Sequence, residues 1–170
     1  GTQSLPRLVG VELAIRMMLS GEPIDAKTAY DHGLLDQLCE DSLEDGCLQF
    51  MKKVIDDPVE MPLLRQSPDY DEVFFEEQYQ AVSSKSYGFA APKRILDCVH
   101  AACHLSLEKG LAYEQKQFFE LVTGPESSGM RYLFMQEHLS RHVQGVDMAS
   151  AMPINSVGIV GGGLMGSGIA

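Results

Sequence analysis

The chain has 170 residues and a formal net charge of −11, from 24 acidic and 13 basic side chains. Such an acidic chain repels the phosphates of nucleic acid and of anionic lipid, so we expect neither as a partner. A hydrophobic content of 45% is ordinary for a globular protein. No apolar run reaches the roughly 18 residues of a transmembrane segment. The bulk numbers indicate a folded protein of about one domain.

The amino-terminal part of the sequence predicts short helices with clear ends. Residues 11–19 carry apolar side chains at helical spacing, and Gly21 after them is a suitable C-cap. Asp25 is a suitable N-cap for a second helix over residues 26–32. Ser42 opens a sequence that resembles a capping box, which predicts the start of a third helix.

The middle of the chain predicts a surface loop followed by further helices. Three prolines between residues 58 and 68 argue against helix, so we expect a loop there. Residues 71–84 can again be helical. Pro92 suits the first turn of the next helix, which we expect to run to about residue 107 and to be broken by Gly110. A helix after that ends at Gly124, and a last one follows it.

The four cysteines match neither a zinc-knuckle nor a disulfide spacing, so we interpret them as reduced thiols of an intracellular protein. On a helix, His100, Cys103 and His104 would share one face, a geometry that could hold a metal. The alternative is that Cys103 is a small buried hydrophobe and that the histidines are partly exposed. Because no fourth ligand is evident nearby, the sequence predicts no metal site.

The last residues change character from helical to strand and turn. Residues 154–160 are β-branched and apolar, which predicts a buried parallel strand. Gly161-x-Gly163-x-x-Gly166 follows directly and matches the dinucleotide-binding fingerprint. The first glycine would permit the tight turn, the second the approach of a pyrophosphate, and the third close packing of helix on strand. The alternative is a glycine-rich turn or tail without a ligand.

The fingerprint is not complete within this sequence. The acidic residue that binds the ribose is expected about 20 residues further on, but only four residues follow Gly166. One strand and the start of one helix cannot complete a βαβ unit, and a lone strand has no ladder partners. We therefore expect the tail to be poorly supported in the isolated chain, which should not bind NAD appreciably.

Three stretches, taken in order, carry a resemblance to known proteins. Residues 1–10 (GTQSLPRLVG) and 33–36 (GLLD) resemble the C-terminal part of the crotonase, or enoyl-CoA hydratase/isomerase, fold. Residues 91–99 and 110–118 resemble the helical connector of the multifunctional fatty-acid β-oxidation enzymes. Residues 161–170 (GGGLMGSGIA) resemble the start of the 3-hydroxyacyl-CoA dehydrogenase domain of the same enzymes.

The resemblance implies a division of the chain and a fold class. It assigns residues 1–88 to the C-terminal part of a crotonase-like α/β domain, residues 89–152 to a helical connector, and residues 153–170 to the first strand and glycine turn of a Rossmann domain. By itself the chain is expected to be mainly α. A start without Met fits an internal segment, although it also fits a processed or tagged protein.

The resemblance also implies an activity for the whole enzyme. Such an enzyme hydrates 2-enoyl-CoA to 3-hydroxyacyl-CoA and then oxidises the product to 3-ketoacyl-CoA with NAD⁺. The resemblance places the catalytic residues of both reactions outside these 170 residues, so we expect no catalytic residue in the chain. Acyl-CoA thioesters are the expected substrates, and a thiolase subunit is a candidate partner. The compartment would be the cytoplasm in a bacterium, or the peroxisome or mitochondrion in a eukaryote.

Five residues inherit a binding role from the resemblance. Gly161, Gly163 and Gly166 match the NAD loop, and the backbone of Met165 would contact the cofactor. Glu137 matches an acidic connector position assigned to substrate binding. The alternatives are packing under the helix for Met165 and a solvated helix-face carboxylate for Glu137.

Two further hypotheses stay open beside the enzyme. The chain could be a non-catalytic helical interaction module, since its middle is helical and carries scattered apolar residues. It could also be a stand-alone enoyl-CoA hydratase with a glycine-rich tail. The coding sequence on both sides of the segment discriminates between the three, because only the bifunctional enzyme needs upstream glutamates and a downstream histidine.

Overall fold

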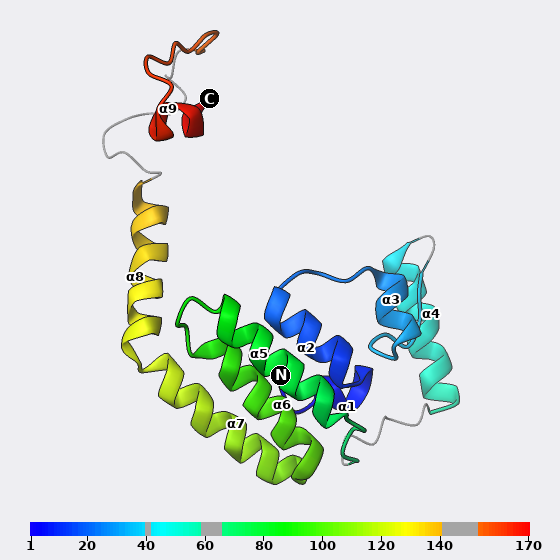
Figure 1. The fold of residues 1–170 in the computed structure, drawn as a ribbon. Helices are drawn as coiled ribbons and strands as arrows, with labels where there is room; N and C mark the ends of the chain where they lie inside the picture. Colours follow the sequence, from blue (N-terminus) through cyan, green and yellow to red (C-terminus); the bar gives the residue numbers. More distant parts are fainter. Residues whose placement is uncertain (40–41, 59–65, 141–152) are drawn as a thin grey trace. The chain divides into compact units, whose positions relative to one another are not determined.

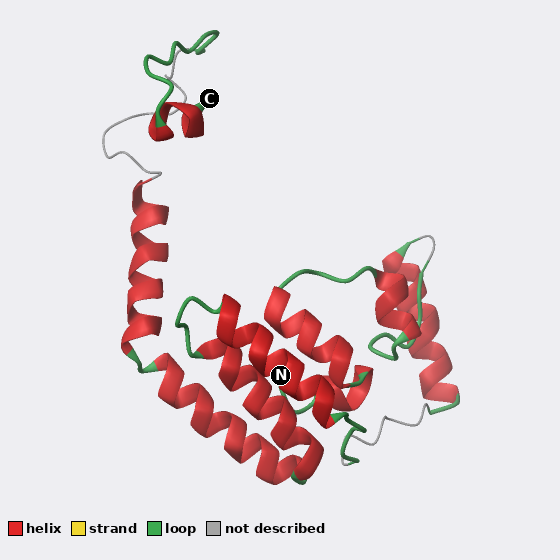
Figure 2. Cartoon of the chain, in the orientation of Figure 1, coloured by secondary structure: helices red, strands yellow, loops and turns green. Residues whose placement is uncertain are grey.

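The computed structural model describes residues 1–39, 42–58, 66–140 and 153–170, which form helices and loops (Figures 1 and 2). In chain order the helices are α1 (Leu5–Val9), α2 (Val11–Ser20), α3 (Ala26–Asp31), α4 (Leu43–Asp56), α5 (Glu72–Lys85), α6 (Ala91–His104), α7 (Leu107–Val122), α8 (Pro125–Ser140) and α9 (Leu164–Ile169). The chain divides into two compact units, Gly1–Gly129 and Met130–Ala170. The prediction of a mainly α chain is confirmed.

The predicted helix ends of the amino-terminal part are confirmed at the level of single hydrogen bonds. Gly21 ends α2 in the left-handed conformation, with φ of 66°. The Asp25 carboxylate accepts a hydrogen bond of 2.8 Å from the Thr28 amide at the start of α3. The Ser42 hydroxyl accepts one of 3.3 Å from the Asp45 amide at the start of α4. Local capping chemistry therefore accounts for these boundaries.

The break predicted at Gly110 is wrong. α6 ends at His104, and Ser106 caps the start of α7 by accepting a hydrogen bond from the Lys109 amide. Gly110 lies inside α7 and is buried. A Cβ at this position would overlap the side-chain oxygen of Gln3, so glycine is present for close approach and not to end a helix.

The main hydrophobic core lies where α2, α5 and α6 meet. Ile15, Phe75, Leu96 and Val99 expose at most 1% of their surface and anchor this cluster. α6 is the central element, because it packs against α1, α2, α5 and α7 (Figure 1). On α5 the buried residues are Phe75 and Val82, whereas Val73 is exposed.

Polar side chains of the amino-terminal segment join it to α6. The fully buried Gln3 amide donates a hydrogen bond of 2.7 Å to the Cys98 carbonyl. The Arg7 guanidinium donates to the carbonyls of Ala102 and Leu105 at 2.9 and 3.0 Å. These carbonyls belong to the end of α6, which has no intrahelical donors left for them, and a cation there also suits the helix dipole.

The amino-terminal segment also contacts α7, through hydrogen bonds to the Glu114 carboxylate. Glu114 accepts hydrogen bonds of 2.7 Å from both the amide and the hydroxyl of Thr2. Thr2 belongs to the stretch that resembles a crotonase, and Glu114 to the stretch that resembles the helical connector. Within the unit Gly1–Gly129, the two stretches are therefore in direct contact.

The strand predicted over residues 154–160 does not form in this chain. Residues 153–162 have no regular secondary structure, and Val157 and Val160 are exposed. The described part of the chain offers no neighbouring strand, so an extended segment here has no ladder partners. Of the proline-marked loop predicted between residues 58 and 68, residues 59–65 lie outside the described residues, and residues 66–68 are not helical. The end of the predicted connector, residues 141–152, also lies outside the described residues.

Candidate functional site

The three fingerprint glycines form a turn at the start of α9. Gly161 has φ of 105°, a conformation that glycine adopts without strain. Gly163 is the N-cap of α9 with extended backbone, and its carbonyl accepts a hydrogen bond of 2.9 Å from the Ser167 amide. A Cβ on Gly166 would overlap the carbonyl oxygen of Gly161. The first and third glycines are thus needed for the turn itself.

The second glycine has a different environment. A Cβ on Gly163 would meet no atom within 4 Å, so the space above the turn is open. Open space beside exposed backbone amides is what an approaching pyrophosphate requires, and the residues present therefore fit such a group. The Met165 side chain is 77% exposed. Contact of the Met165 backbone with a cofactor stays a prediction.

Glu137 lies on α8 and its side chain is exposed. Its backbone carbonyl accepts a hydrogen bond of 2.8 Å from the Ser140 hydroxyl. An exposed position is compatible with the solvated carboxylate that we gave as the alternative. Substrate binding by Glu137 stays a prediction.

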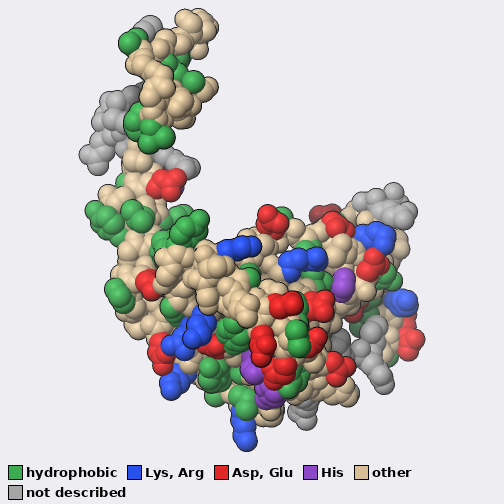
Figure 3. Space-filling view, viewed as in Figure 1, with side chains coloured by type: hydrophobic (Ala, Val, Ile, Leu, Met, Phe, Trp, Pro, Cys, Tyr) green, Lys and Arg blue, Asp and Glu red, His purple; other side chains and the backbone are tan. Residues whose placement is uncertain are grey.

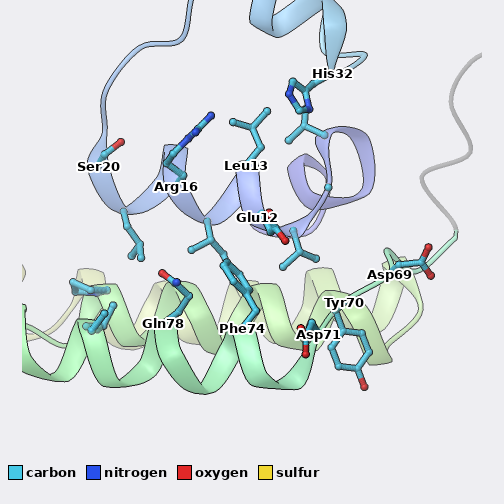
Figure 4. Close-up of a pocket in the computed structure, with 18 of the residues that line it drawn as sticks. Glu12, Leu13, Arg16, Ser20, His32, Asp69, Tyr70, Asp71, Phe74 and Gln78 are labelled. Atoms are coloured by element: carbon cyan, nitrogen blue, oxygen red, sulfur yellow. The ribbon is translucent and has the colours of Figure 1, made fainter.

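An open groove of about 1120 Å³ lies between α2 and α5 (Figure 4). Phe74 and Gln78 point from α5 toward α2, and Arg16 lies on the opposite wall. Acidic side chains, Glu12 and Asp71 among them, lie near the same opening. Because the lining combines charges of both signs with apolar side chains, it indicates no particular class of ligand. The sequence did not predict the groove, because α2 and α5 are 50 residues or more apart in the chain.

The cysteine and histidines of α6 separate into two environments. Cys103 is buried, its thiol donates to the Val99 carbonyl, and burial raises its pKa to about 11. The buried Cys103 sulfur does not belong to the group of potential ligand atoms that includes both histidines. His100 and His104 instead approach each other, with 3.1 Å between their Nε2 atoms. Glu72 of α5 completes a group of three, with an oxygen 3.4 Å from the His100 Nε2 atom.

Sequence reasoning missed Glu72 because it is far from both histidines in the chain. No sequence signal marks it, since an acidic residue in the first turn of a helix is ordinary. Figure 3 shows acidic side chains spread over the face in view, with histidine side chains among them. Only the packing of α5 on α6 brings the carboxylate and the imidazoles together.

The chain is thus mainly helical, and its glycine fingerprint lies at the start of the short helix α9. No family model matches the sequence. The fatty acid oxidation complex subunit alpha of Shewanella loihica is 34% identical over 178 residues, covering 100% of this chain and 25% of that protein. The subunits of the same name from Shewanella amazonensis and Shewanella oneidensis are 33% and 34% identical, with the same coverage.

The chain is therefore a homologue, over its whole length, of one segment of the fatty acid oxidation complex alpha subunit. This confirms the resemblance seen in the sequence. The chain spans about a quarter of the length of the curated relatives that it matches. In the described residues, no helix is both long enough and apolar enough to cross a membrane.

Proposed function

We propose that this chain belongs to a bifunctional enzyme of fatty-acid β-oxidation, which hydrates 2-enoyl-CoA and oxidises 3-hydroxyacyl-CoA with NAD⁺. The observation that carries the proposal is the match of the whole chain to one continuous quarter of the alpha subunits. The glycine turn at residues 161–166 supports the oxidation half. The domain division at residues 88 and 152 belongs to the same proposal.

In this proposal the chain supplies binding elements and no catalytic group. When bound, NAD⁺ would supply the hydride acceptor for oxidation of the 3-hydroxyacyl substrate. Gly161 and Gly166 shape the turn, while Gly163 leaves room for the pyrophosphate at the amide end of α9. The backbone of Met165 would contact the cofactor, and Glu137 would bind the acyl-CoA substrate. A thiolase subunit is the candidate partner of the complex.

The test uses the enzyme that the complete coding sequence specifies. Hydration of 2-enoyl-CoA and NAD⁺-dependent oxidation of 3-hydroxyacyl-CoA are both assayed with purified protein. Gly163→Val should reduce oxidation at limiting NAD⁺ by about tenfold or more, because about 1.4 kcal/mol of lost cofactor binding suffices for that. Hydration should keep its rate, since the turn does not belong to that half.

Gly162→Val is the matched control. Gly162 also has free space around a Cβ and no positive φ, so the side chain is tolerated, but it occupies a position that the fingerprint leaves open. Equal loss from both variants would contradict the role of Gly163. Absence of both activities from the complete enzyme would contradict the proposed function and leave the helical interaction module as the better hypothesis.

A further inference from the structure

Glu72, His100 and His104, here called the histidine–glutamate cluster, lie on two helices of the main core. His100 and His104 are one helical turn apart on α6, and Glu72 is the first residue of α5. One potential ligand atom from each residue lies within 4.8 Å of the other two. Two imidazoles and one carboxylate are donors that Zn²⁺ accepts in proteins.

The distances match those between ligands of a tetrahedral ion. Metal–ligand bonds of about 2.0–2.1 Å place neighbouring ligand atoms about 3.3 Å apart in a tetrahedron. The two imidazole Nε2 atoms are 3.1 Å apart, and the Glu72 oxygen is 3.4 Å from the Nε2 atom of His100. Without an ion, the short Nε2–Nε2 distance requires that one imidazole donates a hydrogen bond to the other.

Aromatic packing holds the two imidazole rings in place. The His100 ring stands edge-on to the buried Phe75, with 4.7 Å between the ring centroids. The His104 ring stands in the same way against Tyr70 at 4.8 Å. Leu96, one helical turn before His100, and Val99 are buried in the core and fix α6 in position. Restricted rings reduce the entropy lost when an ion binds.

Exposure at the cluster leaves room for water as a further ligand. The His100 side chain is 32% exposed and that of Glu72 is 62% exposed. A site with three protein ligands and an accessible remaining position takes a water molecule there. The geometry points to a divalent transition-metal site, with Zn²⁺ as the ion, that joins the start of α5 to the end of α6.

The test measures Zn²⁺ binding by calorimetry in the full 170-residue chain. Cys39→Ser and Cys47→Ser form the background, because these exposed thiols can bind Zn²⁺ themselves. We expect one equivalent to bind with micromolar affinity. His104→Ala and Glu72→Gln should each weaken binding by about tenfold or more. Both side chains are exposed, so these variants keep the fold.

The control variants change a histidine and a glutamate that lie outside the histidine–glutamate cluster. His32→Ala deletes the exposed histidine at the C-cap of α3, and Glu76→Gln changes a carboxylate one turn further along α5. Both should leave the affinity unchanged. Titration with Co²⁺ should give visible bands without the near-ultraviolet charge transfer of a thiolate ligand. Equal affinity in His104→Ala, equal losses in the controls, or no Zn²⁺ binding would each overturn the site.

Discussion

The close contact between Gly110 and Gln3 constrains which residue each position accepts. Gln3 is fully buried and needs the Cys98 carbonyl as its hydrogen-bond acceptor, which fixes its side chain against α7. Only a residue without a Cβ leaves space for the Gln3 side-chain oxygen. The cost of a glycine inside a helix is offset by this buried polar contact.

Gly110→Ala should destabilise the protein by about 1–3 kcal/mol, because the new methyl group displaces a buried side chain. Urea unfolding followed by circular dichroism measures the loss. Gly129→Ala is the control, since a Cβ there meets no atom within 4 Å and alanine favours helix. If Gly110→Ala were instead as stable as Gly129→Ala, or more stable than the parent protein, helix propensity and not the contact with Gln3 would decide the effect.

The cysteines should differ in reactivity and in their effect on alkaline stability. Cys39 and Cys47 are exposed and should react quickly with a thiol reagent, whereas Cys98 and Cys103 should react only after unfolding. Burial raises the pKa of both inner thiols, from 9.0 to about 11 for Cys103. Four equally fast thiols in the native protein would contradict the described burial.

The raised pKa of Cys103 also links stability to pH. Below pH 9 the thiol is protonated in both states, but between pH 9 and about 11 only the unfolded state releases its proton. Unfolding is therefore favoured as the pH rises through this window, and Cys103 should contribute a loss of about 1–2 kcal/mol. Urea unfolding at both ends of the window measures it, and Cys103→Ala should make the dependence shallower.

At the scale of elements, the helices differ in how they are stabilised. α6 buries Leu96, Val99 and Ala102 completely and contacts four other helices. α4 has no buried residue, and its apolar positions Leu48, Met51 and Ile55 are all exposed. Capping and propensity alone leave a helix of this length marginal in water.

Hydrogen exchange should separate these two helices. The amides of α6 should exchange slowest in the chain, at rates set by global unfolding, and those of α4 should exchange quickly through local opening. Mass spectrometry of peptides from each helix measures the difference. Equal protection of α4 and α6 would indicate that α4 is covered by something that the isolated chain does not show.

For the molecule as a whole, the glycine turn and the helical core differ in how much of their apolar surface is buried. Residues 153–170 expose nearly all their apolar side chains, whereas the unit Gly1–Gly129 has a buried core. A turn whose strand lacks ladder partners cannot hold its amides in position for a ligand.

The 170-residue chain should therefore show no saturable NAD⁺ binding at micromolar concentration. Calorimetry or quenching of NADH fluorescence measures this, with the complete enzyme as the positive control. Saturable micromolar binding by the chain alone, lost in Gly163→Val, would show that the turn is preorganised without the rest of a Rossmann domain.

The sequence by itself determined the local features of this protein. Capping residues such as Asp25 and Ser42 mark helix starts through hydrogen bonds to amides three positions away, so short-range chemistry suffices to predict them. The glycine spacing at residues 161–166 is equally local. The resemblance of ordered stretches then led to the correct relatives.

Only the tertiary structure decided which distant residues meet. The sequence alone predicts a helix break at Gly110, and only the structure shows that Gln3 lies against it. Glu72 comes near the two histidines only because α5 packs on α6. The strand predicted over residues 154–160 does not form, because a strand needs neighbouring strands for its backbone hydrogen bonds and the described residues provide none. Contacts between residues far apart in the chain depend on the packing of whole elements, and sequence periodicity carries no record of them.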